Sequence, residues 1–219
     1  MQARQMGMEA FLEAHQRVKA ANDAMTSRNN LKLIGLGFHI FHDVYRKLPG
    51  SANHKEGSAG VPNDSKTFPF SWRVAILPFV EQQALFEQYR FDQPWDSESN
   101  LKLLDQMPQI YRSPFAPAEQ PSGHTNYQGF VTGASALGKD DGLPFREVRD
   151  GTSNTLLLVE TKNAVPWTKP QDIEGEAEYF DDHPLIYLTC DGSVRTMDPV
   201  DKEKLAKMIT RDGREVVQP

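Results

Sequence analysis

Residues 27–45 read SRNNLKLIGLGFHIFHDVY, and their apolar side chains recur at the spacing of an α-helix. They form two neighbouring stripes, one made of Leu31, Ile34, Phe38, Phe41 and Tyr45 and the other of Leu33, Leu36, Ile40 and Val44. The polar face that remains is narrow and holds Lys32, Gly35, His39 and His42. An apolar arc of this width must be covered, so we expect this helix to be the spine of a domain, packed on a sheet or on a partner.

This helix is predicted to begin well before residue 27. It should run from about residue 5 to Tyr45, with a break at the polar residues 26–30, because such side chains favour caps and turns over helix interiors. A segment with Gly, Pro, Asn and Ser follows at residues 50–67 and predicts an exposed loop.

Shorter helices are predicted after this loop. The apolar spacing of residues 71–89 suits one or two helices, and Pro78 should interrupt them. A further short helix should be capped by Asp96 and should turn Leu101 and Leu104 inward.

Beyond about residue 111 the apolar residues alternate, which indicates strands. Residues 125–131 and 155–160 predict two of them. Residues 185–197 predict a hairpin, since two alternating runs flank Asp191 and Gly192, a pair that suits a two-residue turn with positive φ at both positions.

A last helix should begin at Asp198 and Pro199, and three of its residues should face inward: Leu205, Met208 and Ile209. Helices come first, strands second and one helix last, which is the order of an α+β fold. A chain of 219 residues is long enough for one such domain. We expect a helical extension at residues 1–26 and a single α+β domain at 27–219.

Charge and cysteine content exclude several classes of function. The net charge is −6 and Lys and Arg are scattered, so the basic surface that nucleic-acid binding requires is missing. The single cysteine, Cys190, excludes an internal disulfide and a cysteine-based zinc cluster. It stands in an apolar run and should be a small buried residue.

Several short motifs occur in an order known from one protein family. NNLK, IGL and HxxHD lie in the first helix at residues 29–43, and the later motifs are SWR with LP and EQ, PWDS with Asn100, MP with YRSP, TNYQG, DGTSNTLLLVE, VPWTKP with Asp172, and DGSV. Together they cover most of residues 27–197. In these motifs the chain resembles the large planctomycete family of prepilin-like proteins of unknown function, also labelled solute-binding protein family ten.

The resemblance implies a fold similar to that of type IV pilins and secretion pseudopilins, in which a long N-terminal helix lies against an antiparallel sheet. It also implies an exported protein at the periplasm or the cell surface. Family members often carry a leader and a long apolar helix before the NNLK motif, but residues 1–25 here are polar, with a thin apolar stripe. No window reaches the roughly 20 apolar residues that span a bilayer. We expect a soluble part of a protein tethered by an upstream anchor, or an unanchored branch of the family.

Two groups of side chains could hold a metal. His39 and His42 share a helix face beside Asp43, but ligation would need further ligands from elsewhere, and a solvated polar stripe is the simpler interpretation. In the segment DGTSNT at residues 150–155, Asp150 and Asn154 could bind calcium together with Glu160.

A tight turn explains DGTSNT without a metal, because Ser, Asn and Thr side chains bond to nearby backbone. Glu160 would also lie roughly 17 Å from Thr155 along a strand, at about 3.3 Å per residue. We therefore expect no metal and no cofactor.

The loop VPWTKP between Glu160 and Asp172 could present Trp167 to a sugar or peptide ligand. Its prolines stiffen the segment. A Trp in a rigid loop is more often buried, because it covers a large apolar area.

Searches for catalytic motifs find no phosphate-binding loop, no GxSxG, no HExxH and no GxGxxG. We expect no catalytic residue. The first hypothesis is a non-enzymatic structural or assembly domain with protein partners or self-assembly. The alternative is a solute- or glycan-binding module that uses the Trp167 loop and the turn at 150–155, and a hydrolase is a third, weaker reading. An exposed Trp167 would favour the binding module, and a buried one would favour the structural domain.

Overall fold

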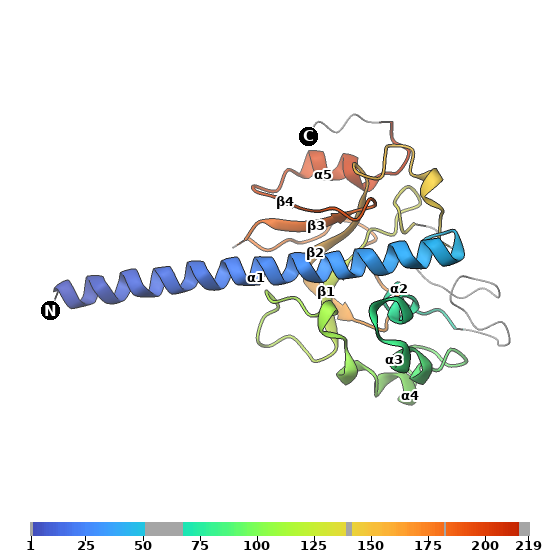
Figure 1. Ribbon diagram of the computed structural model, residues 1–219, viewed down its shortest axis with the longest axis horizontal. Coiled ribbons are helices and arrows are strands. Elements are labelled where there is room, and N and C mark those ends of the chain that lie inside the picture. Colours follow the sequence, from blue (N-terminus) through green and yellow to red (C-terminus); the bar gives the residue numbers. More distant parts are fainter. Residues whose placement is uncertain (1, 51–67, 139–141, 182, 215–219) are drawn as a thin grey trace.

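The computed structural model describes residues 2–50, 68–138, 142–181 and 183–214, with side chains from residue 8 onward. Helix α1 (Gln2–Tyr45) lies across one face of a four-stranded antiparallel sheet and projects beyond it towards the N-terminus (Figure 1). The predicted α+β fold, with a long N-terminal helix packed on an antiparallel sheet, is therefore confirmed. Apart from Gly50, the predicted loop at 50–67 lies outside the described residues.

Helix α1 is continuous, so the predicted break at residues 26–30 is wrong. The polar side chains find hydrogen-bond acceptors that keep the helix intact: Thr26 Oγ1 donates to the Asn22 carbonyl (2.9 Å), and Asn30 Nδ2 donates to the Arg112 carbonyl (3.0 Å). These residues do not cap a helix; they tie α1 to the domain. No helix among the described residues is long and apolar enough to cross a membrane.

The domain covers only one of the two apolar stripes of α1. As predicted, four residues of the first stripe are fully buried: Leu31, Ile34, Phe38 and Phe41. The second stripe is exposed, and so is Tyr45, although the width of the apolar arc predicted full cover. Two glycines bring neighbouring elements close to α1, because a Cβ at Gly35 would lie 3.0 Å from Leu188 and one at Gly37 would lie 2.7 Å from Val80.

The sheet has the strand order β1-β2-β3-β4, and every neighbouring pair is antiparallel. Its strands are β1 (His124–Gln128), β2 (Leu156–Pro166), β3 (Leu185–Thr189) and β4 (Val194–Met197). Strands near 125–131 and 155–160 were predicted, but β1 ends at Gln128 and β2 continues to Pro166. The extra length of β2 pairs with the start of β1, where His124 is opposite Pro166.

The sheet lies between two helices. One face packs on α1 through Leu157, Leu158, Ile186 and Leu188, and the other packs on α5 (Lys202–Ile209) through Leu156, Val159, Leu185 and Tyr187. Leu205 and Met208 of α5 are buried, as predicted, and Ile209 is half-buried. The helix begins later than predicted, because Asp201, not Asp198, caps it and accepts from the Lys204 N–H (2.9 Å).

Short helices fill the segment between α1 and β1, and one more precedes β2. They are α2 (Trp72–Ala75), η1 (Leu77–Val80), α3 (Gln83–Gln88), α4 (Glu98–Leu101), η2 (Leu104–Gln106), η3 (Gln109–Tyr111) and η4 (Phe145–Glu147). The predicted interruption at Pro78 is confirmed, since α2 ends before it. The predicted cap Asp96 is wrong: Ser97 caps α4, and Leu101 is exposed.

The hairpin of β3 and β4 is confirmed, but its turn differs from the predicted one. Thr189 is paired with Ser193 through its N–H (3.0 Å), and the Gly192 N–H donates to the Thr189 carbonyl (3.0 Å). The loop therefore has three residues, 190–192, and within the described chain only Gly192 of this loop has a positive φ, +84°. Cys190 lies in the loop and is fully buried.

Replacing Gly192 with valine is expected to lower the free energy of unfolding by about 1–3 kcal/mol, because a β-branched residue is strained at positive φ. The new Cβ would also lie 3.3 Å from His39 Nε2 on α1. Gly175→Val is a matched control, since a Cβ at Gly175 meets no described atom within 4 Å. Urea unfolding measures both variants, and equal midpoints for the two would contradict this account of the turn.

Candidate functional site

Trp167, the residue predicted to be presented on a loop, is fully buried. It directly follows β2, its Nε1 donates to the Leu103 carbonyl (3.2 Å), and its ring stacks on Tyr111 with 6.1 Å between centroids. The indole therefore fills the core and is not available to a ligand. Of the two alternatives drawn from the sequence, this placement favours the structural domain over the binding module.

Asp172 lies in a buried ion pair with Arg73, and neither side chain is exposed. Its carboxylate accepts from Arg73 Nη2 (2.9 Å), from Trp72 Nε1 (3.1 Å) and from the Gly129 N–H (2.8 Å). Burial raises the pKa of Asp172, whereas the Arg73 guanidinium and the N–H donors lower it. The pair joins α2 to the segment after β2 and belongs to the framework of the domain.

Arg73 itself was missed by the sequence-based search. Besides Asp172 it donates to the Tyr127 carbonyl (2.8 Å) and to Ser71 Oγ (3.0 Å), and its guanidinium lies 4.4 Å from the centre of the Trp72 ring. The signal that could have found it is the motif SWR, where Arg follows Trp in a segment that is otherwise apolar. A buried Arg needs an acid, and Asp172 supplies it.

Glu160 is buried on β2 within a cluster of hydroxyl groups. Its carboxylate accepts from Ser27 Oγ on α1 (2.8 Å) and from Ser113 Oγ (2.5 Å), and Ser27 in turn accepts from the Tyr127 hydroxyl (3.0 Å). Burial raises the pKa of Glu160 to about 7, and the two serine hydroxyl groups oppose this shift. The cluster therefore fixes α1 on the sheet at the point where the helix leaves the domain.

The turn at residues 150–155 fastens the C-terminal segment. The Asp150 carboxylate accepts from the N–H groups of Gly213 (2.7 Å) and Arg214 (2.8 Å), and Asn154 Nδ2 donates to the Asp150 carbonyl (3.1 Å). Asp150 and Glu160 thus bind different partners. In the part of the chain that the structure describes, no three His, Cys, Asp or Glu side chains converge on a possible metal site.

His39 and His42 pack against an aromatic ring. Their rings lie 4.9 and 4.3 Å from that of Phe145, measured between centroids, and His42 Nε2 accepts from the Phe145 N–H (3.3 Å). Burial lowers the pKa of His42, which favours the neutral ring that this hydrogen bond requires. The pair therefore helps to seat α1 beside η4.

Two hollows of the surface are not lined by the predicted ligand-binding residues. One of about 210 Å³ separates α5 from residues 175–179, and another of about 370 Å³ lies under residues 112–124. Neither is lined by Trp167 or Asp172, nor by the turn at 150–155. Ser113, which donates to Glu160, lines the second hollow, but Glu160 itself does not.

The surface feature that remains is the exposed apolar stripe of α1. It comprises Met8, Phe11, Val18, Met25, Leu33, Leu36, Ile40 and Val44, each between 37% and 66% exposed, and is called the outer stripe. At about 100° per residue, these side chains fall within an arc of about 100°, centred about 150° from the buried face of α1. No Lys, Arg or Glu of residues 8–44 falls inside this arc, and Asp43 lies at its edge.

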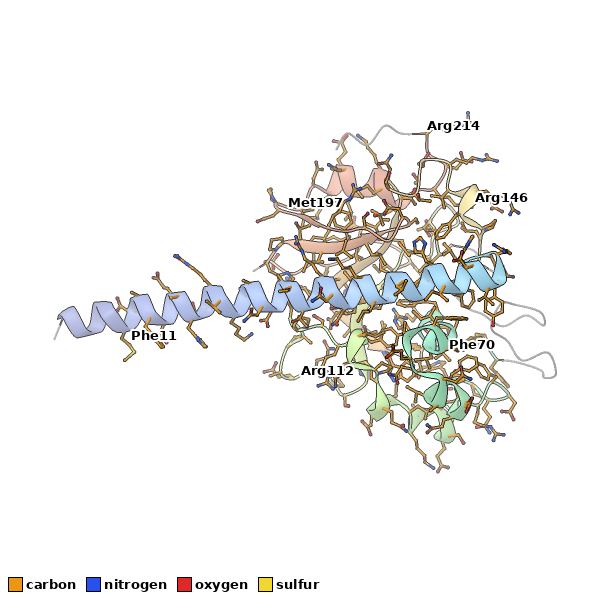
Figure 2. All side chains as sticks on the ribbon, viewed as in Figure 1. Phe11, Phe70, Arg112, Arg146, Met197 and Arg214 are labelled. Carbon is orange, nitrogen blue, oxygen red and sulfur yellow. The ribbon has the colours of Figure 1, made fainter. Side chains whose placement is uncertain are left out.

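The outer stripe runs along nearly the whole helix, so part of it lies over the domain and part on the projecting end. Figure 2 shows Phe11 on this projecting end, away from the sheet. Exposed apolar patches of a few hundred Å² and more mark interaction sites in soluble proteins. The outer stripe is therefore the candidate functional site.

Comparison with protein families gives one match. Residues 16–189 match the model of a family described as a protein of unknown function (DUF1559). The chain belongs to this family. No curated protein and no solved structure matches the chain.

The DUF1559 match covers the framework described above. It begins in α1 and ends with β3, so it includes Arg73, Asp172 and the Glu160 cluster. Residues 1–15, β4 and α5 lie outside the matched range. The match identifies the family, whose description names no function.

Proposed function

We propose that this chain is a non-enzymatic structural or assembly domain and that it binds other protein chains through the outer stripe of α1. The observation that carries the proposal is the position of this stripe, on the side of α1 opposite the face that the domain buries. A helix that is apolar on two sides needs two partners. The sheet is one, and a second protein surface is the other.

A role without catalysis is supported by the use of the polar groups inside the domain. Asp172 neutralises a buried Arg, Glu160 binds Ser27 and Ser113, and Asp150 binds the C-terminal backbone. Each of these acids has a structural partner that accounts for it. Perturbed carboxyl groups can also mark active sites, but here burial and the anchoring of α1 explain the perturbation of Glu160.

The architecture supports a pilin- or pseudopilin-like relationship, since a long N-terminal helix lies on an antiparallel sheet. We extend the proposal to a location at the periplasm or cell surface. The net charge of −6 supports protein partners and not nucleic acid.

The proposal predicts assembly that depends on the outer stripe. Cells that produce the full-length protein are treated with a cross-linker, and the protein is detected by immunoblotting. The double variant Val18→Glu, Leu36→Glu should lose the high-mass adducts of the wild type, because it places two charges in the apolar arc. Both residues are exposed, so the domain should still fold.

The matched control is Ala20→Glu, which adds a charge to an exposed position on the far side of the projecting part of α1. Its adducts should equal those of the wild type. Adducts that persist unchanged in the double variant would refute assembly through the outer stripe. So would an equal loss in the control, which would indicate a general effect of charge.

A further inference from the structure

The outer stripe has a nearly symmetric spacing about its middle. Val18 precedes Met25 by 7 residues and Leu33 follows it by 8, while Phe11 and Ile40 lie 14 and 15 residues away. A helix that is turned end to end about a point next to Met25 therefore presents Phe11, Val18, Leu33 and Ile40 at matching heights. The apolar side chains of two copies of α1 can therefore pair when the two helices run antiparallel.

This symmetry determines which chain can cover the stripe. We infer that two copies of this chain pair through their outer stripes, with the two α1 helices antiparallel and the two-fold axis beside Met25. Phe11 of one copy then lies against Ile40 of the other, and Val18 lies against Leu33. The inference rests on the proposed function and names the partner. A two-fold interface of this kind is closed, because the same patch serves both copies.

The pairing covers the part of α1 that its own domain leaves bare. Residues 8–22 are exposed, and Asp23 and Ala24, which follow them, are half-buried. An isolated helix of this length is marginal in water. In the antiparallel pair this projecting end lies on residues 29–43 of the second copy, which the second copy's domain holds in place. Figure 1 shows the two halves of α1, one beyond the sheet and one across it.

The area of the stripe fits a stable interface. Its eight side chains are about half exposed, and with roughly 100 Å² each they offer about 800 Å² per copy, which is the usual contribution of one partner to a specific interface. The stripe runs over 37 residues from Met8 to Val44, and the 36 steps between these two span about 54 Å at 1.5 Å per residue. A second helix of the same length is the surface that covers it from end to end.

Charge favours the antiparallel direction over the parallel one. In the antiparallel pair Asp43, which lies at the edge of the arc, is level with Met8 of the second copy. In a parallel pair it would be level with Asp43 of the second copy. The helix dipoles also oppose each other favourably when the helices are antiparallel.

The pairing is tested by disulfide cross-linking of the full chain between engineered cysteines. Cys190 is buried and does not compete. A mixture of Val18→Cys and Leu33→Cys chains should give a covalent dimer containing one of each, because these positions lie opposite each other. Val18→Cys alone should give none, since its two copies would lie about 22 Å apart along the axis and a disulfide requires Cα atoms within about 7 Å.

Sedimentation of the purified chain gives the second measurement. The wild type and Ala20→Glu should form dimers, and Val18→Glu should raise the dissociation constant at least tenfold. A covalent dimer from Val18→Cys alone would overturn the antiparallel arrangement and leave the proposed function standing. A chain that stays monomeric, but still gives stripe-dependent adducts in cells, would overturn the second copy as partner and keep the stripe as the assembly surface. A chain that stays monomeric and gives no stripe-dependent adducts in cells would overturn both proposals.

Discussion

Replacing Asp172 with alanine is expected to lower the free energy of unfolding by about 3–5 kcal/mol. The change leaves the Arg73 guanidinium buried without its acid, and removing one member of a buried ion pair costs about this much. It also leaves the indole N–H of Trp72 and the Gly129 N–H without their acceptor. Urea or thermal unfolding followed by circular dichroism measures the loss.

The matched control is Asp181→Ala, which removes the same group from an ion pair with Lys162 whose Asp181 side chain is 90% exposed. Exposed pairs contribute little, so this variant should unfold close to the wild type. A double variant Arg73→Met, Asp172→Leu should recover part of the loss, because apolar side chains of similar size need no partner. If Asp172→Ala unfolds like Asp181→Ala, the ion pair does not hold the framework together.

The sequence predicted the elements whose signals are local. The helix that contains Ile34 and Phe38, the order of helices and strands, and the glycine of the β3–β4 hairpin each depend on spacing within a few residues. The exact turn was missed because a three-residue loop with one positive φ also suits Asp191 and Gly192. Local patterns determine which residues share a face, and here they were sufficient for the fold.

The roles of the site residues depend on contacts that no local pattern contains. Glu160 binds Ser27, which is 133 residues away in the sequence, and Asp172 binds Arg73, which is 99 residues away. From the sequence alone Glu160 and Asp172 are therefore predicted to bind a ligand, because only the fold shows which side chains they contact. The prediction of a helix break at the polar residues 26–30 is wrong for the same reason.

The stripe of Leu33, Leu36, Ile40 and Val44 was predicted to be covered, because periodicity reports how apolar a face is and not which chain covers it. Leu33, Leu36 and Ile40 have the same spacing as the buried residues beside them. Only the position of the sheet shows that one stripe is buried and the other is bare. The exposed stripe is therefore proposed as an assembly surface and not as part of the core.

The Glu160 cluster should make stability depend on pH. Burial raises the pKa of this carboxyl in the folded protein to about 7, above the ordinary value of about 4.3 in an unfolded chain. Between these two values the folded state keeps a proton that the unfolded state loses, so the folded state is favoured at low pH. Stability contributed by Glu160 is therefore complete below about pH 4 and falls as the pH rises towards 7, and it changes little above that.

Glu160→Gln should remove this dependence, because the amide stays neutral at every pH and can still hydrogen-bond to Ser27 or Ser113. We expect the difference in unfolding free energy between the variant and the wild type to shift in favour of the variant by about 3 kcal/mol between pH 4.5 and pH 8. The difference is measured by urea unfolding at both pH values, which cancels the titration of groups common to both proteins. The exposed Glu119 gives the control, and Glu119→Gln should show no such shift.

Because Ser27 marks the point where α1 leaves the domain, a loss of protection in the amide exchange of residues 26–34 at pH 8 should accompany the wild-type loss of stability. A wild type whose stability relative to Glu160→Gln is the same at pH 4.5 and pH 8 would mean that the carboxyl is ionised throughout, and that Ser27 and Ser113 stabilise the carboxylate more strongly than burial destabilises it.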